Sequence, residues 1–455
     1  MLDNEVPDTS QTRREISTQE ASHISGLSLN HIAYLLRRGK LEGRRFGDRT
    51  WMVFEDSLRG YLATPHKPGR PVNKSSTYSK QLREKPVYQI YDANRAEQTG
   101  SPISPAGRIV VGQGYAEKVQ TNSTSYNLYS LASPNALWLM QKAEIERFAV
   151  DDCILLTNSR GFRGWEREDI KTTVLSSPLP VPADLEELQR ANIPGIENDY
   201  FNSSHYRLAS FTPPFTDFSR LEIMLAPLRF YDYYSITPFL DEPLLTTGDG
   251  SQISTREKYG HTALTYHATG RETAIIPAPV SLQCIVVTQD QQIVLMQRSS
   301  SVSFYPGHWS SSFEENMSAP GIDWKGRPSR SDDADFISGA MRGLEAEFAV
   351  PTSAVENSKI LSLNVEYLTL SVDVIILINV ALSSEEIRQR WLLEAWDRDE
   401  ASRFATVSTD LPAIVNKLFS QTLWHPTSRM RLIQFLFHTY GVNEVAKAIE
   451  DRQRV

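Results

Sequence analysis

The amino-acid sequence predicts an α+β protein of several domains: a small basic head, a mixed α/β middle, a second α/β domain and a helical C-terminal tail. Three observations support this class. Short helix and strand patterns alternate between residues 12 and 63, a buried hairpin pattern followed by an amphipathic helix occurs after residue 279, and helical patterns dominate after residue 384. With 455 residues, 40% of them hydrophobic, the chain can build several cores.

The head, residues 12–63, reads as two short helices followed by a two-stranded wing and a third helix. Ser17 or Thr18 is the predicted N-cap of the first helix, with Glu20 in its first turn. A break at residues 26–28 precedes the second helix, residues 29–37, which Ser28 caps. The predicted strands are residues 41–46 and 50–54, and the third helix is residues 55–62.

These segments resemble the excisionase and MerR-type winged helix-turn-helix family. The matching pieces are residues 17–21, 26–28, 37–41, 47–51 and 61–62. The resemblance implies binding to double-stranded DNA, with the second helix in the major groove. The side chains expected to face bases or phosphates are Ser28, Asn30, His31, Tyr34, Arg37, Arg38, Lys40, Arg44, Arg45 and Arg49. A protein-interaction module of the same shape is the alternative.

Charge is distributed unevenly along the chain. Residues 30–75 contain ten Lys and Arg residues against four acidic ones, whereas the whole chain has a formal net charge of −8. A basic head on an acidic body predicts that DNA contact is confined to the head. Residues 64–85 read as a basic flexible linker, in which Arg70 of a Gly-Arg-Pro sequence is either a minor-groove contact or part of a plain tether.

The remaining divisions follow from changes in pattern. Residues 86–278 are predicted to form a mixed α/β domain of unknown role, residues 279–383 a second α/β domain, and residues 384–455 a helical extension. The aromatic run at residues 230–234 fits either a ligand pocket or a core at a domain junction. Cys153 and Cys284 stand in separate apolar runs, as expected for reduced core residues of a cytoplasmic protein, and neither a membrane span nor a membrane partner is expected.

Residues 279–383 resemble a degenerate member of the Nudix family, which implies an α/β/α sandwich. The strand at residues 293–298 ends in Arg298, a Tyr-Pro-Gly-His-Trp turn ends at Trp309, and a predicted helix over residues 334–348 occupies the place of the Nudix box. In that family three glutamates follow the box arginine by one, four and five positions, and they share one face of the helix. Their carboxylates bind the divalent ions that neutralise a diphosphate and activate water.

The box of this chain departs from that pattern. The arginine is Arg342, but the three glutamate positions hold Gly343, Ala346 and Glu347. Glu345 is about 200° around the helix from Glu347 and cannot join it. Hydrolysis would then need Mg²⁺ as the cofactor and replacement carboxylates, for which the candidates are Asp332, Asp333, Asp335, Glu314 and Glu315.

We therefore expect a DNA-binding regulator whose Nudix-like body binds a nucleotide-type effector or a protein partner without hydrolysis. The predicted ligand contacts are Arg298, Trp309, Arg342 and Glu347, with Arg298 on phosphate and Trp309 on a base. An active pyrophosphohydrolase with Arg342 and Glu347 in its catalytic site, or a non-catalytic scaffold, are the alternatives. Residues 429–437 are apolar around more than half of a helix, which fits burial between domains or in a homo-oligomer.

Overall fold

A computed structural model describes residues 13–25, 32, 35–36, 40–46, 50–63, 131–144, 147–197, 200–211, 220–265, 274–300, 302, 305–321, 334–420 and 422–453. The chain divides into two compact units, Met1–Lys74 and Ser75–Val455. Within the described residues, no helix combines the length and apolar character needed to cross a membrane.

The first unit contains a three-stranded antiparallel sheet in the order β1-β3-β2. Its elements are β1 (Glu15–Ser17), α1 (Thr18–Ser25), β2 (Gly43–Phe46), β3 (Thr50–Phe54) and α3 (Glu55–Ala63). Ser17 is the N-cap of α1, because its Oγ accepts a hydrogen bond from the backbone N–H of Glu20 at 3.1 Å. The predicted wing strands and third helix are present, and strand β1 is an element that the sequence patterns did not predict.

The core of this unit includes the apolar side chains that share helical spacing in the sequence. Ile32, Leu35 and Leu36 are buried together with Ile16 and Val53. The rest of the predicted second helix lies outside the described residues, as do the expected DNA contacts Ser28, Asn30, His31, Tyr34, Arg37, Arg38, Arg49 and Arg70 and the side chain of Arg45. The helix-turn-helix assignment therefore stays a prediction.

The second unit is built on a mixed nine-stranded sheet. Its main path is β13-β12-β11-β16-β15-β5-β4, with β14 paired to β11 and β17 paired to β12. The strands are β4 (Ala149–Val150), β5 (Cys153–Asn158), β11 (Val280–Val287), β12 (Gln292–Arg298), β13 (Trp309–Ser310), β14 (Phe313–Asn316), β15 (Val355–Glu366), β16 (Val372–Val380) and β17 (Ala401–Ser408). Strands β11 and β16 run parallel, whereas β11 pairs antiparallel with both β12 and β14.

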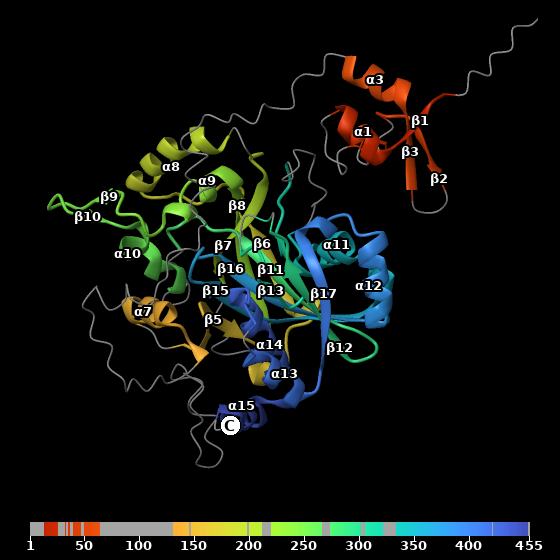
Figure 1. Ribbon diagram of the computed structural model, residues 1–455. Helices are drawn as coiled ribbons and strands as arrows, with labels where there is room; N and C mark the ends of the chain where they lie inside the picture. The colour runs from red at the N-terminus through yellow and green to blue at the C-terminus, as the bar shows by residue number, and fades with distance from the viewer. Residues whose placement is uncertain are drawn as a thin grey trace, which may run out of the picture. The chain divides into compact units, whose positions relative to one another are not determined.

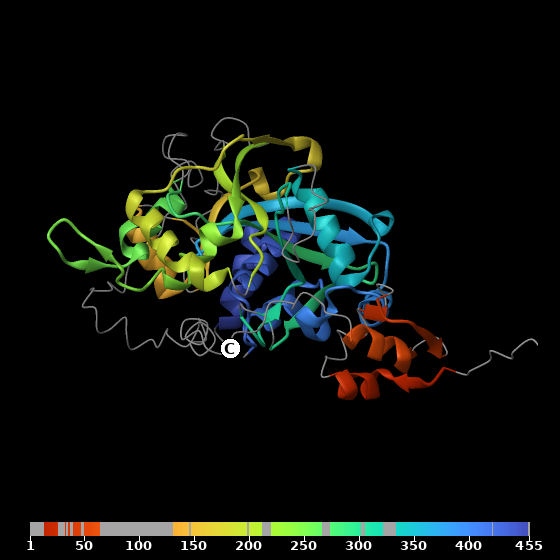
Figure 2. The same ribbon diagram turned by 90° about the horizontal axis from the view of Figure 1, so that it is seen from above.

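Helices cover both faces of this sheet and make an α/β/α sandwich (Figures 1 and 2). One core lies under α11 (Phe336–Phe348) and α12 (Ser384–Leu393) and contains Leu282, Cys284 and Val286 of β11. The other core lies under α13 (Leu411–Leu418), α14 (Pro426–Tyr440) and α15 (Val442–Gln453) and contains Ile285 and Val287. Alternate residues of β11 thus enter opposite cores, as the two-residue period of a strand requires.

The remaining elements pack beside the sandwich. A second sheet has the order β6-β8-β7 and a third pairs β9 with β10. The strands and helices are α7 (Pro134–Lys142), β6 (Ile170–Val174), α8 (Ala183–Ile196), β7 (Ser204–Phe211), β8 (Leu221–Arg229), α9 (Phe230–Tyr234), β9 (Leu245–Thr246), β10 (Gln252–Ile253) and α10 (Thr255–Tyr259). Short 3₁₀ turns are η2 (Arg160–Phe162), η3 (Arg167–Asp169), η4 (Thr237–Phe239), η5 (Gly260–Leu264), η6 (Thr352–Ala354) and η7 (Arg398–Glu400).

Two expectations from the sequence, the domain boundaries and the helical tail, need correction. The boundaries at residues 278 and 383 do not divide the structure, because β5 from the predicted middle and β17 from the predicted tail join the same sheet. The tail is not wholly helical for the same reason. The apolar circumference of α14 is covered within the chain by the sheet and by the helices on either side of it. The aromatic rings of α9 pack against one another and against Tyr200, and they form a small core.

Candidate functional site

Helix α11 lies where the sequence places the Nudix box. Its N-cap is Asp335, whose Oδ1 accepts the backbone N–H of Ser338 at 2.7 Å, while Oδ2 accepts from the guanidinium of Arg167 at 2.8 Å. The helix ends at Ala349, which adopts a left-handed backbone with φ of 54°. Asp335 is thus engaged at the start of the helix, and Asp332 and Asp333, which the sequence offered as replacement ligands, lie outside the described residues.

Glu315 of β14 lies beside the first missing box position. A β-carbon built on Gly343 would stand 2.6 Å from the Cε2 atom of Phe313 and 3.1 Å from the Cβ atom of Glu315. Such distances are shorter than ordinary carbon contacts, so the absence of a side chain at 343 lets β14 pack directly on α11. The strand then supplies a carboxyl group where the helix has none.

Four carboxyl groups interact electrostatically around the end of α11. Burial, reinforced by Glu400 and Asp397, raises the pKa of Glu315 to about 8 against the opposing effect of Arg342. Burial also raises the pKa of Glu347 well above its usual range, and Glu400, Asp397 and Glu315 add to that increase. The helix positions alone leave Glu347 as the single carboxyl on this face of α11. The structure adds the carboxyls of Glu315, Asp397 and Glu400, whose charges act on it.

Asp397 and Glu400 reach this place through the segment that follows α12. The backbone N–H groups of Trp396 and Asp397 donate to the carbonyl oxygen of Ala346 at 2.9 and 3.1 Å. At its other end, the carbonyl oxygen of Glu400 accepts from the N–H of Ser299 at 2.8 Å. The segment is thus fixed between the last turns of α11 and the residue after Arg298.

Helix α11 does not supply the full ligand set for the magnesium that the Nudix resemblance implies. Within the described ranges, no group of three or more His, Cys, Asp and Glu side chains could hold a metal ion. Gly343 and Ala346 offer no ligand at two of the three box positions. A preorganised divalent-metal site needs ionised oxygens at close range, so we derive no catalytic step through magnesium.

Two predicted ligand residues, Arg298 and Arg342, contribute positive charge that acts on Glu347 and Glu315 respectively. The charge of Arg298 lowers the pKa of Glu347, and that of Arg342 lowers the pKa of Glu315, in each case against larger opposing effects. Arg298 also forms an ion pair with Glu314 at 3.2 Å and is 17% exposed. Arg342 lines a cleft of about 320 Å³ together with Arg167, Ser338, Met341, Glu345 and Thr352.

Trp309, which the sequence placed with Arg298 as a ligand contact, packs elsewhere. Its ring lies against the core under α13 and α14, and the ammonium group of Lys417 stands 5.7 Å from the ring centroid. Its strand partner is Gln297, the residue before Arg298, and the pairing of β12 with β17 is irregular between Gln297 and Arg298. Base stacking on Trp309 stays a prediction, because its half-buried ring packs against the core under α13 and α14.

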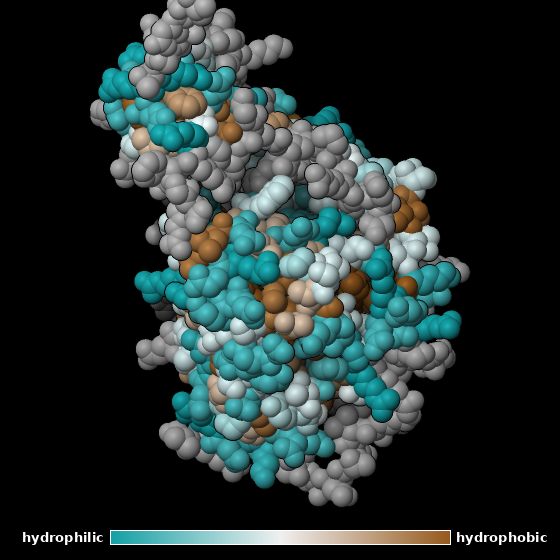
Figure 3. All heavy atoms as spheres, turned by 90° about the vertical axis from the view of Figure 1, so that its right-hand side faces the viewer, coloured by the Kyte–Doolittle hydropathy of each residue, from teal (hydrophilic) through white to brown (hydrophobic). Residues whose placement is uncertain are grey.

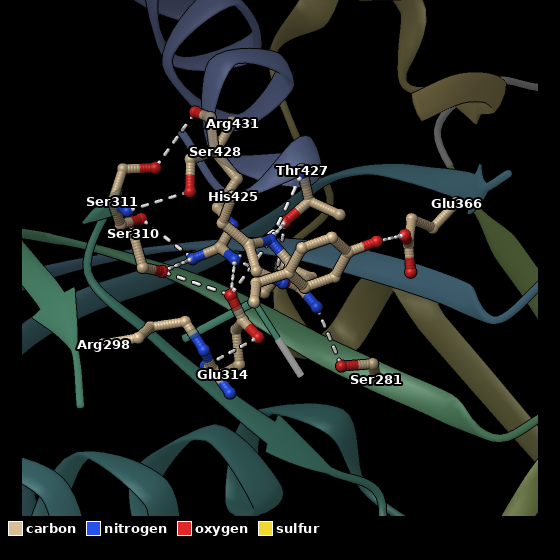
Figure 4. Close-up of polar contacts among 12 residues, drawn as sticks. Ser281, Arg298, Ser310, Ser311, Glu314, Glu366, His425, Thr427, Ser428 and Arg431 are labelled. Atoms are coloured by element: carbon tan, nitrogen blue, oxygen red, sulfur yellow. Dashed lines mark hydrogen bonds and ion pairs between the residues drawn. The ribbon is translucent and has the colours of Figure 1, made fainter. Parts of the chain in front are cut away.

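A second polar cluster lies on the other face of the sheet, under α14 (Figure 4). Arg431 is fully buried and donates to Glu314 at 2.5 Å, to Thr427 at 2.8 Å and to Ser310 at 3.0 Å. Burial lowers the pKa of His425 to about 3, so this imidazole is neutral at neutral pH. Burial opposes ionisation of Glu314, but the neighbouring charges, those of Arg298 and Arg431 at neutral pH, keep its pKa below the ordinary value.

The same cluster continues to the turn between β15 and β16. The hydroxyl of Tyr305 donates to Glu366, whose pKa burial raises to about 7, and Thr369 donates to the same carboxyl at 2.6 Å. Asp373, 1% exposed, accepts from Gln283 at 3.2 Å. The sequence patterns did not select these residues; the one available signal was a polar side chain inside an apolar pattern, as with Asp373 in β16 and Arg431 in α14.

Comparisons with known proteins add little. No protein family matches the sequence, and no curated protein matches it either. Among solved structures, DR0079 from Deinococcus radiodurans is 10% identical with a TM-score of 0.24, over 34% of this chain and 80% of that one. A MutT protein from Methanosarcina mazei Go1 is 14% identical with a TM-score of 0.20, over 35% and 93%. TM-scores of this size do not establish a common fold.

Proposed function

We propose that the Ser75–Val455 unit is a Nudix-like sandwich that binds a nucleotide-type ligand through its phosphate groups without hydrolysing it. The observation that carries this proposal is the composition of the α11 site. Gly343 and Ala346 replace two metal-binding carboxylates, whereas Arg298 and Arg342 remain beside Glu315 and Glu347. The site thus keeps cationic groups for phosphate and lacks two of the three carboxylates that the Nudix box would supply to a metal.

The chemistry expected of such a site is anion recognition. Guanidinium groups bind phosphate oxygens through two parallel N–H donors, and they stay charged at every pH of interest. A carboxyl that keeps its proton, as the raised pKa of Glu315 indicates at neutral pH, can donate a hydrogen bond to a phosphate instead of repelling it. Phosphate binding should therefore weaken as the pH rises through about 8.

For the Met1–Lys74 unit we propose binding to double-stranded DNA, so that the whole chain is a ligand-responsive regulator. Of the described candidates, Lys40 and Arg44 are both exposed. The guanidinium of Arg44 forms an exposed ion pair with Glu15 at 2.6 Å, which DNA phosphates could displace at small cost. The proposal also includes a homo-oligomer, since two heads would double the contact with DNA.

The test of ligand binding is a panel of nucleoside diphosphates and nucleotide sugars with the purified full chain. Thermal unfolding and product formation are measured together, with Mg²⁺ and with a chelator. We expect at least one ligand to raise the melting temperature equally in both conditions, with no product. Arg342→Met should remove the shift, whereas Arg388→Met, an exposed arginine of α12, should retain it. Absence of any shift would overturn the proposal.

Hydrolysis is the second candidate, and one observation favours it. Asp397 and Glu400 act on Glu347 together with Glu315, so a bound cation could draw carboxyls from three separate elements. The discriminating result is metal-dependent turnover that Glu347→Gln abolishes. Unchanged turnover in Glu347→Gln would exclude this site as the source of the activity.

A further inference from the structure

Trp396 is more exposed than the other tryptophan side chains that the structure describes. Its side chain is 74% exposed, whereas Trp165, Trp391 and Trp424 are 0%, 7% and 9% exposed. Leu393, at the end of α12, is 62% exposed. Figure 3 views the side of the molecule that carries α12 and shows apolar side chains there as separate patches among hydrophilic ones. An exposed indole offers a large flat π face on which another aromatic ring can stack.

The backbone that carries Trp396 is held in place. Its N–H donates to the carbonyl oxygen of Ala346 at 2.9 Å, and the N–H of the preceding Ala395 donates to the carbonyl oxygen of Arg390 at 3.2 Å. The guanidinium of Arg390 in turn reaches the carbonyl oxygen of Ala349 at 3.3 Å, and Arg398 donates to that of Leu392 at 2.7 Å. The ring is therefore exposed on a fixed support, which lowers the entropy cost when a ligand stacks on it.

The position of that support relates Trp396 to the α11 site. Ala346 directly precedes Glu347, and the segment 396–400 ends in a hydrogen bond to Ser299, the neighbour of Arg298. The segment 396–400 thus connects two places. Trp396, at its start, is bonded to the last turn of α11, one turn after Arg342, and Glu400, at its end, is bonded to the residue after Arg298. The residue that the sequence favoured for stacking, Trp309, packs on the other face of the sheet.

We propose that Trp396 is the stacking platform for the base of a nucleoside diphosphate whose phosphates bind at Arg298 and Arg342; this rests on the function proposed above. The flat π face of an indole accepts any base, and stacking of this kind contributes strongly and with little dependence on base identity. The subsite therefore selects for the presence of a base and discriminates weakly among bases.

The test compares ADP, GDP, CDP and UDP with inorganic pyrophosphate, which has the phosphates and no base. Affinities are measured by calorimetry on the full chain and its variants. We expect the diphosphates to bind more tightly than pyrophosphate and to quench tryptophan fluorescence. Trp396→Ala should weaken them by about ten-fold or more while pyrophosphate binding is unchanged. Trp396→Phe should keep part of the gain, and Leu393→Ala, which alters another exposed apolar side chain, should keep all of it.

The remaining outcomes separate the two proposals. Diphosphates that bind wild type and Trp396→Ala equally well, or no better than pyrophosphate, would overturn the stacking platform and leave phosphate binding intact. Equal loss of diphosphate and pyrophosphate binding in Trp396→Ala would also overturn it, because the residue would then act by holding the segment. Failure of wild type to bind pyrophosphate and every diphosphate would overturn the proposed function itself.

Discussion

The Cβ atom of Glu315 lies 3.1 Å from the place that a β-carbon on Gly343 would occupy. A strand residue and a helix residue thus share one space, and the strand residue brings the carboxyl group. This relationship explains why α11, which has no carboxyl at positions 343 and 346, still ends beside a group of acidic side chains.

The first prediction concerns that shared space. Gly343→Ala places a methyl group against the ring of Phe313, which is 3% exposed and has no room to withdraw. We expect the free energy of unfolding to fall by about 1–3 kcal/mol, as for other overpacked core sites. Urea unfolding checks this value. Gly248→Ala is the control, because nothing lies within 4 Å of the added carbon, and an equal fall there would contradict the packing argument.

The second prediction is a pH dependence of stability. The pKa of Glu315 is raised to about 8 in the folded chain from an ordinary value of 4.5, so the folded state binds more protons between these values. The free energy of unfolding should therefore fall as the pH rises from about 4.5 to about 8. The stability that the protonated Glu315 contributes is fully present below this pH range and is lost above it. Glu315→Gln should flatten the fall, measured by urea midpoints across the range.

Other buried carboxyls, such as Glu366 with a pKa of about 7, will keep part of the slope in that variant. The matched control is Glu345→Gln, an exposed residue of the same helix as Gly343, which should leave the slope unchanged. A wild-type slope in Glu315→Gln would mean that its carboxyl is not the buried, protonated group described above.

The third prediction tests the ion pair under α14. Arg431→Met leaves Glu314 without the guanidinium at 2.5 Å inside a buried cluster, and we expect the free energy of unfolding to fall by about 3–5 kcal/mol. The double variant Arg431→Met with Glu314→Gln removes both charges and should be more stable than Arg431→Met alone. A double variant less stable than either single one would show that the charges are not coupled.

The fourth prediction addresses the head. Arg44→Ala combined with Arg45→Ala should weaken DNA binding. The slope of log affinity against log salt concentration should become shallower by about 0.9 for each phosphate that is no longer neutralised. The control is Arg59→Ala on α3, which pairs with Glu55 and is outside the expected DNA-binding residues. Fluorescence anisotropy over a salt series measures both quantities. An unchanged salt slope in the double variant would contradict the assignment.

The sequence by itself determined the local elements. A cap at Ser17 or Thr18, the wing strands β2 and β3, the hairpin of β11 and β12, and the end of α11 at Phe348 follow from periodicity and capping, which depend on neighbours in the chain. The Nudix-like order of elements and the absence of helix carboxylates at 343 and 346 are equally visible there.

Only the tertiary structure decided which distant side chains meet. Pairing of β5 and β17 with the sheet, Glu315 against Gly343, and the approach of Asp397 and Glu400 to Glu347 all join segments far apart in sequence. Local patterns report which face of an element is apolar and leave open what covers it. For that reason the sequence favoured Trp309 as a stacking residue. In the structure Trp309 packs against the core under α13 and α14, whereas Trp396 is exposed beside the end of α11.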